Sequence, residues 1–437
     1  FDHFDDEFGE DGTERAATET TDRAIAFLNQ GQAPLFLWVH YFDPHDPYEP
    51  PEPFASQYPD DPYLGEIAYT DQQVGRLITA FEERFGAQPW KIIVVGDHGE
   101  GLGDHGEALH GNLLYQGAMR VPLIVAGSEI PAGRIDSAVS VRQIFETVLD
   151  WAGDGHPGGV LDEASEPILG EALKPYLQYG WQPQVMAVYD GIKVIRSGDT
   201  EVFDLRADPG ELDNLAGQVE LVPEIRHAIS TYLEQALAEA ESGGADLSQE
   251  EKEKLASLGY FGSTSRTMLR DDAPNPRDMV HLYRDLDVGA GLFIRQEYEK
   301  AIPVFERILD SDPGNFMAAL RLAVAHSAVG QQAEAERYFE TAQAIDPSSV
   351  DLWHYQAMHY LRNRQWEAAQ PLFESVLAVT PDRLPALRGL AQIYTRQRRL
   401  EDAAGLLERI VQIVDAPGLE SARLGELRMA LGDTQGA

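Results

Sequence analysis

The sequence contains no cysteine, so disulfide bonds and thiol chemistry are excluded within its 437 residues. It has no apolar run approaching ~18 residues, the length that a membrane-spanning helix needs, and we expect no segment to cross a membrane. Basic residues are scarce, since 34 Lys and Arg stand against 73 Asp and Glu and give a formal net charge of −39. This charge argues against a nucleic-acid-binding surface, because phosphates would be repelled. An anionic ligand would need a local positive group such as a metal ion, although solubility alone explains the acidity equally well.

The C-terminal part of the sequence repeats with a period of 34 residues. Prolines recur at this spacing, at Pro313, Pro347 and Pro381. Three further columns keep the same period, two of small residues (Ala301, Ala335, Ala369 and Ala403; Gly289, Ala323, Ala357 and Ala391) and one of large residues (Phe305, Phe339, Phe373 and Leu407). Small residues let paired helices approach closely, large residues fill the groove between hairpins, and proline ends a helix.

These columns resemble the tetratricopeptide pattern, with repeats at 282–315, 316–349, 350–383 and 384–417 and a capping helix at Leu419–Leu431. We therefore expect residues 281–437 to form an all-α tetratricopeptide solenoid. Stacked helical hairpins form a groove suited to peptide segments, so the expected role is binding of a protein partner or self-association. Shielding or positioning a neighbouring domain is the simpler alternative. The prolines and polar residues of 263–280 predict an extended linker before the repeats.

Residues 1–180 predict strands that alternate with helices. Apolar runs at Pro34–Tyr41, Lys91–Val95 and Val121–Ala126 are typical of buried strands, the second of them central, and Tyr63–Phe85 has helical periodicity. This alternation predicts an α/β fold in which helices are layered on a largely parallel sheet.

Beyond Trp181 the pattern changes to short strands. Runs at Gln184–Tyr189, Ile192–Arg196 and Glu201–Asp204 are separated by turn-forming residues and followed by a helix around Val222–Glu241. Residues 181–262 are therefore expected to form a small antiparallel α+β subdomain.

Side chains suited to chemistry follow two of the predicted strands. Asp97 and His98 lie between glycines directly after the Lys91–Val95 strand. Ligands of open α/β sheets bind beyond the carboxyl ends of strands, and an Asp and a His there can offer an oxygen and a nitrogen to one divalent cation. A glycine-rich turn without a ligand explains the motif equally well. His45 lies in a proline-stiffened loop after the Pro34–Tyr41 strand, and His105 and His110 follow in a second Asp-His-Gly-Glu segment.

Taken together, these segments resemble the sulfatases of the alkaline-phosphatase-like superfamily. The resemblance is carried by FLWVHYFDPHDPYEPP at 36–51, VVGDHGEGLGDHGEALHG at 94–111 and LYQGAMRVPLIV at 114–125. EVFDLRADPGELDNLA at 201–216 and KLASLGYFG at 254–262 resemble the tail of the same family. The match covers residues 1–262 and implies an alkaline-phosphatase-like sheet layered with helices.

The resemblance also implies roles for four residues. Asp97 and His98 match the later pair of metal ligands, and the family metal is usually Ca²⁺, sometimes Mg²⁺ or Mn²⁺. Many family members have Asn where His98 stands, and a nitrogen ligand suits calcium less than oxygen does, so the identity of the metal stays open. His45 matches a histidine that contacts the sulfate oxygens. His110 matches a position that contacts the sulfate or protonates the leaving oxygen.

The family nucleophile is a formylglycine made from a C/S-x-P-x-R segment, and this sequence has neither that segment nor the early Asp pair of the metal site. We expect both upstream of Phe1, together with any signal peptide, and we expect these 437 residues alone to be inactive. The implied reaction is hydrolysis of a small-molecule or glycan sulfate ester, in an exported protein of the periplasm or the extracellular space. A phosphonate or phosphate ester is the alternative substrate, and a catalytically dead scaffold that acts through the repeats is the third hypothesis.

Overall fold

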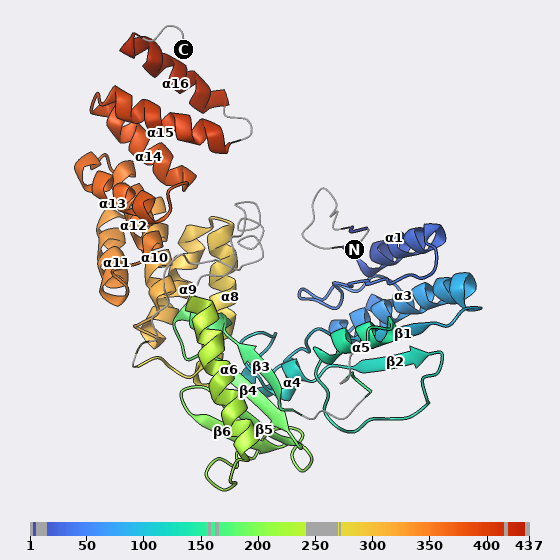
Figure 1. Cartoon of the computed structure of the whole chain (residues 1–437). Coiled ribbons are helices and arrows are strands. Elements are labelled where there is room, and N and C mark those ends of the chain that lie inside the picture. Colours follow the sequence, from blue (N-terminus) through green and yellow to red (C-terminus); the bar gives the residue numbers. More distant parts are fainter. Residues whose placement is uncertain are drawn as a thin grey trace. The chain divides into compact units, whose positions relative to one another are not determined.

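The computed structural model describes residues 3–5, 15–155, 159–161, 166–241, 270, 272–414 and 418–432. The chain divides into two compact units (Figure 1). The first comprises Phe1–Gly99 and Met119–Asp136, and the second Glu100–Ala118 and Ser137–Ala437. No helix among the described residues is long and apolar enough to cross a membrane. Of the predicted features, the KLASLGYFG segment and most of the linker lie outside the described residues.

The first unit contains a group of packed helices and a two-stranded sheet. Its elements are α1 (Ala17–Gln30), α2 (Phe54–Gln57), α3 (Pro62–Phe85), β1 (Lys91–Val95) and β2 (Leu123–Gly127). The predicted helix at Tyr63–Phe85 is confirmed as α3, which begins with an Asp61 side chain that accepts a hydrogen bond from the Leu64 amide. α3 packs along α1, where the Tyr69 hydroxyl accepts a hydrogen bond of 2.8 Å from the Thr18 amide.

Two expectations for this unit are wrong. β1 pairs with β2 in antiparallel register, with Ile93 opposite Val125, so the described strands form no parallel sheet. The chain returns from β1 to β2 through a loop and the one-turn helix α4 (Gln116–Met119), whereas a parallel pair needs a crossover, usually a full helix. The segment Pro34–Tyr41 is not a strand, because the sheets of the described part contain only β1–β2 and four strands of the second unit. Its Phe36 and Trp38 side chains are 57% and 70% exposed, which a buried strand would not allow.

The second unit contains a four-stranded antiparallel sheet, and one helix packs on it. Its strands are β3 (Ile168–Ala172), β4 (Gln184–Tyr189), β5 (Ile192–Arg196) and β6 (Thr200–Asp204), in the spatial order β3-β4-β5-β6, and the helix is α6 (Pro223–Glu241). Three of these strands and the helix were predicted, whereas β3 was not. Asp190 and Gly191 both have positive φ, 50° and 79°, in the two-residue turn between β4 and β5. Ile225 and Ile229 of α6 pack on Val185 and Val202 of the sheet.

Short connecting elements complete this part of the second unit. They are η1 (Asp104–Gly106), α5 (Gln143–Trp151), the π-helical turn η2 (Pro175–Tyr179) and the 3₁₀ turn η3 (Pro276–Met279).

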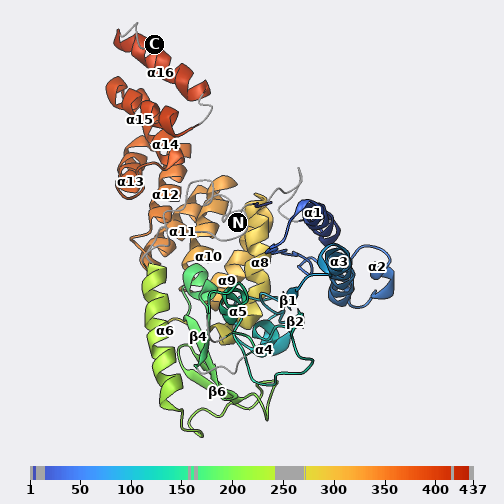
Figure 2. The same cartoon turned by 45° about the vertical axis from the view of Figure 1, so that its right-hand side comes forward.

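The tetratricopeptide prediction is confirmed by a run of helices of 13–15 residues each, shown in two views in Figures 1 and 2. They are α8 (Val280–Ile294), α9 (Tyr298–Ser311), α10 (Phe316–Ala328), α11 (Gln332–Ile345), α12 (Val350–Arg362), α13 (Trp366–Val379), α14 (Leu384–Arg396), α15 (Leu400–Ile413) and α16 (Gly418–Leu431). Ala301, Ala335, Ala369 and Ala403 are all fully buried. A Cβ on Gly289 would lie 2.9 Å from the Phe305 ring, which explains why the column of small residues must stay small.

Candidate functional site

The Asp97–His98 pair occupies a turn directly after β1. The Gly96 amide donates to the Pro122 carbonyl at 3.3 Å, which ties the turn to the residue before β2. The His98 amide donates to Asp97 Oδ1 at 2.9 Å, and His98 Nε2 lies 3.7 Å from Asp97 Oδ2. Both side chains reach the surface, 68% exposed for Asp97 and 46% for His98. Asp97 and His98 therefore present an oxygen and a nitrogen side by side on an accessible edge.

This pair fits two ligands of a divalent cation. His98 Nδ1 lies 2.9 Å from the Gly99 carbonyl oxygen. A hydrogen bond from one ring nitrogen to a carbonyl leaves the other nitrogen as the ligand atom, an arrangement common around metal-binding histidines. The described residues hold no group of three or more His, Asp or Glu that could bind a metal.

His45 lies in a loop that is hydrogen-bonded to α1 and α3. Its amide donates to Glu66 Oε2 of α3 at 3.1 Å, and the Glu49 amide donates to Glu66 Oε1 at 2.7 Å. Asp43 accepts a 2.6 Å hydrogen bond from the Ala17 amide at the start of α1. The His45 ring lies 4.2 Å from the Phe42 ring, and its Nδ1 lies 2.6 Å from the Asp46 carbonyl. The loop is therefore positioned by carboxylates from its own sequence and from α3.

These carboxylates have altered pKa values. Burial raises the pKa of Glu66, against the lowering effect of the Glu49 and His45 amides. Burial likewise raises the pKa of Asp43, and the Ala17 amide opposes this shift. Sequence reasoning missed both residues as parts of the site. No sequence pattern relates Glu66 to His45, and only the structure shows that this glutamate is 4% exposed on the packed face of α3.

His110 belongs to the second unit, in a loop that buried glutamates organise. Its Nδ1 lies 3.1 Å from Oε1 of Glu100, whose side chain is 6% exposed. Glu107 accepts hydrogen bonds from the Asn112 amide at 2.8 Å and the Leu113 amide at 3.2 Å, and burial raises its pKa. Asp97 and His98 lie together in one turn of the first unit, which also contains His45. His110 belongs to the second unit.

Comparison with known proteins found family matches for both parts of the chain. The family model described as Sulfatase matches residues 5–154, and two models described as Tetratricopeptide repeat match 292–358 and 356–418. Residues 5–154 therefore carry a sulfatase-family domain, and residues 292–418 carry tetratricopeptide repeats. The resemblance drawn from the sequence motifs is thereby confirmed.

Individual sulfatase relatives are distant. The uncharacterized sulfatase YidJ of Escherichia coli is 25% identical, over 46% of this chain and 52% of its own length. The N-acetylglucosamine-6-O-sulfatase of Bacteroides thetaiotaomicron is 28% identical, over 45% of this chain and 38% of its own. A solved putative sulfatase from Bacteroides fragilis is 19% identical with a TM-score of 0.44, over 50% of this chain and 58% of that one. The chain spans about half or less of the length of these curated relatives.

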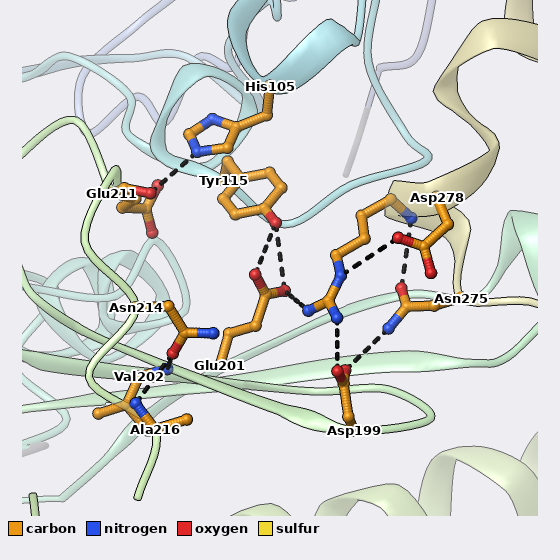
Figure 3. A network of polar contacts seen from close by, with 11 residues as sticks. His105, Tyr115, Asp199, Glu201, Val202, Glu211, Asn214, Ala216, Asn275 and Asp278 are labelled. Atoms are coloured by element: carbon orange, nitrogen blue, oxygen red, sulfur yellow. Dashed lines mark hydrogen bonds and ion pairs between the residues drawn. The ribbon is translucent and has the colours of Figure 1, made fainter. Parts of the chain in front are cut away.

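The loop of the sulfatase-family region that carries His110 also contains His105, which has a structural role. The His105 ring stacks on Tyr115 with centroids 3.6 Å apart, and its Nε2 lies 3.0 Å from the Glu211 carbonyl. Figure 3 shows Tyr115 pointing to Glu201, which accepts its hydroxyl hydrogen bond at 3.0 Å. Burial raises the pKa of Tyr115, and the negative charge of Glu201 raises it further.

Arg277, just before the repeats, completes this network. Its Nη1 lies 2.9 Å from Glu201 Oε2, and it also forms an ion pair with Asp199. Asn275 donates to Asp199 at 3.0 Å (Figure 3). The loop of His105 and His110 is thus connected through Tyr115 and Glu201 to the residues that begin the repeat block.

The expected extended linker is corrected by these contacts for the part of 263–280 that the structure describes. The Gln182 amide donates to the Pro274 carbonyl at 3.0 Å, and the Trp181 indole donates to Asp312 Oδ2 at 2.7 Å. Trp181 is fully buried, next to Tyr179 and Tyr283. Polar residues that suit a linker are used here as hydrogen-bond partners between the sheet and the first repeat.

Proposed function

We propose that this chain is part of a metal-dependent sulfatase that converts R–O–SO₃⁻ and water into R–OH and sulfate. The observation that carries the proposal is the accessible Asp97–His98 pair at the end of β1, inside the region that matches the sulfatase family. We propose a glycan or a small molecule as the R group. The sulfate group is an anion and the chain has a net charge of −39, so without a bound cation the chain would repel the substrate.

Asp97 and His98 would hold the cation, and calcium is the proposed ion, with magnesium or manganese as alternatives. A divalent cation there would offset the negative charge of the sulfate group and polarise it. The exposed carboxylate of Asp97 suits any of these ions, and the ring nitrogen of His98 favours a softer one.

His45 and His110 are the proposed contacts to the sulfate ester. The Glu66 carboxylate fixes the backbone of His45, so the ring is held on a positioned loop. Glu100 beside His110 Nδ1 would accept a hydrogen bond from a proton carried on Nδ1 and so hold the ring with its Nε2 turned to the substrate. Protonated His110 can then give its Nε2 proton to the leaving alkoxide oxygen.

The nucleophile is proposed to be a formylglycine encoded upstream of Phe1. The 437 residues contain no Cys and no Ser-x-Pro-x-Arg from which it could be made, and the chain spans 52% and 38% of the length of the two curated sulfatases reported above. The repeats are proposed to bind a protein partner.

The test uses the natural full-length protein and three esters of p-nitrophenol: sulfate, phosphate and phenylphosphonate. We expect the sulfate to be the best substrate, EDTA to abolish turnover, and Asp97→Asn to lower kcat/KM roughly hundredfold, since a metal ligand contributes several kcal/mol to transition-state binding. Asp136→Asn is the matched control, because Asp136 is 78% exposed and pairs only with Arg134 among the contacts described. Metal analysis would show loss of the ion in Asp97→Asn.

Other outcomes would contradict the proposal in different ways. A preference for the phosphate ester would assign another reaction to the same residues. Full activity of Asp97→Asn with bound metal would remove Asp97 from the site. Peptide mass analysis without formylglycine would remove the proposed nucleophile.

A further inference from the structure

Four arginines recur at equivalent positions of two neighbouring repeats. Arg362 is the last residue of α12, and Arg364 lies in the turn before α13. Arg396 and Arg398 hold the same places 34 residues later, at the end of α14 and in the turn before α15. All four are exposed, and none forms an ion pair within the described part of the chain.

Other arginines of the same two repeats are paired. Arg383 lies 2.7 Å from Asp351, and Arg388 lies 2.8 Å from Glu420. Carboxylates are therefore available close by in the fold, and the four exposed guanidinium groups point to a ligand from outside the described residues.

An open cleft of about 320 Å³ lies at two of these arginines. It is lined by Met358, Leu361, Arg362, Arg364, Trp366 and Gln392. Met358, Leu361 and Trp366 pack against the buried core of the repeats, so they form a fixed apolar surface. The guanidinium of Arg396 lies 4.9 Å from the centre of the Trp366 ring, which brings the third arginine to the edge of the cleft.

We propose that this arginine cleft (the cleft of about 320 Å³ with Arg362 and Arg364 in its lining and Arg396 at its edge) binds an acidic peptide segment with an apolar residue between carboxylates. A guanidinium binds a carboxylate through two parallel hydrogen bonds, so paired arginines select Asp and Glu side chains. Ser327 accepts a 2.7 Å hydrogen bond from Arg362 Nη1, which restricts that side chain before binding. The inference rests on the proposed role of the repeats in partner binding, and it is independent of the sulfatase reaction.

Charge complementarity and the apolar surface together favour an acidic peptide over other anions. A nucleic acid would extend beyond the four arginines onto a chain of net charge −39 and be repelled. A sulfated glycan would satisfy the arginines but leave the Met358–Leu361 surface without an apolar partner. An acidic segment with an aliphatic side chain satisfies both parts of the cleft.

The experiment measures fluorescence polarisation of a fluorescein-labelled peptide of alternating glutamate and leucine on the 437-residue chain. We expect saturable binding that weakens as NaCl is raised. Labelled glutamine–leucine and glutamate–glycine peptides should bind much more weakly, since each lacks one of the two features. Arg362→Ala with Arg364→Ala should weaken binding about tenfold or more, since each charge-assisted contact gives roughly a three- to tenfold effect at an exposed site.

The matched control is Arg226→Ala with Arg284→Ala, because both residues are exposed and unpaired in the described structure and lie outside the cleft. It removes the same charge and should leave affinity unchanged. Equal affinity of the two double variants, or no binding of the glutamate–leucine peptide, overturns the proposal. Binding of a heparin oligosaccharide through Arg362 and Arg364 without peptide binding also overturns it and assigns the cleft to sulfated glycans. None of these results depends on ester hydrolysis, so they leave the sulfatase proposal to its own test.

Discussion

Replacing Trp181 by phenylalanine tests whether the antiparallel sheet and the first repeat form one cooperative structure. Trp181 has no exposed surface, and its indole N–H donates to Asp312 Oδ2 at 2.7 Å. Asp312 is 5% exposed and also accepts hydrogen bonds from Arg270 at 3.1 Å and Asn315 at 3.3 Å. Phenylalanine keeps an aromatic ring between Tyr179 and Tyr283 but removes the donor.

The expected cost is about 2–3 kcal/mol. A hydrogen bond to a charged group contributes about 1.5–3 kcal/mol. Because Arg270 and Asn315 still donate to Asp312, losing the indole donor should cost an amount in the lower part of that range. The smaller ring leaves a void that adds roughly 1 kcal/mol. Because the second unit is large, the midpoint of thermal unfolding should fall by only about 3–5 °C.

The measurement is thermal and urea unfolding followed by far-UV circular dichroism, whose helical signal comes mainly from the repeats. Trp353→Phe is the control, because the Trp353 indole donates to the Pro347 carbonyl at 3.0 Å in an exposed setting and its loss should cost under about 1 kcal/mol. If Trp181→Phe is no more destabilising than the control, the hydrogen bond between sheet and repeat does not contribute to stability as argued.

Three further predictions concern buried groups of the second unit. Lys193 and Glu211 form an ion pair of 2.6 Å with neither side chain exposed, and burial lowers the pKa of Lys193. Lys193→Met should therefore cost about 3–5 kcal/mol in urea unfolding, whereas Lys193→Met with Glu211→Leu should recover most of it; an equally unstable double variant would contradict this. Burial, and then the charge of Arg383, lowers the pKa of His354 to about 3, so the unfolded chain takes up a proton first as pH falls below about 6.5. Stability should fall between pH 6.5 and 3, by about 2 kcal/mol at pH 5, and His354→Gln should show a flatter pH profile; identical profiles would exclude a buried neutral imidazole. A Cβ on Gly389 would lie 2.6 Å from a carbon of the Phe373 ring, so Gly389→Ala should destabilise the protein by about 1–3 kcal/mol. A Cβ on Gly405 meets nothing within 4 Å, so Gly405→Ala should stabilise it by up to about 1 kcal/mol, and chemical denaturation measures both changes.

Sequence reasoning was most accurate for the repeats. Each hairpin buries its own small and large columns against the next hairpin, so the pattern that the sequence displays is the pattern of contacts. Fully buried Ala301 and nearly buried Phe305 are direct instances. The strands after Trp181 were predicted for a similar reason, because short antiparallel strands joined by tight turns depend on neighbours in the sequence.

The segment Pro34–Tyr41 shows where local patterns fail. Its apolar composition predicted a buried strand, but a strand requires a hydrogen-bonded neighbour, which composition does not specify. The sulfatase motifs placed Asp97 and His98 correctly after β1, since strand and turn are contiguous in the chain. The support that Glu66 gives to His45 was not predicted, because the two residues are 21 positions apart and no period relates them.

The sequence by itself determined the family of residues 5–154, the number and phase of the repeats, and the identity of the candidate ligands. Only the tertiary structure decided that His105 is a packing residue on Tyr115, that residues 272–279 bind the sheet, and that Trp181 reaches Asp312 across 131 positions. It also decided that Arg362 and Arg364 line a cleft with an apolar surface and that Arg396 lies over the Trp366 ring of that cleft. The physical reason is the range of the interactions: periodic burial is written in neighbouring residues, whereas single polar contacts between distant segments depend on how the elements pack.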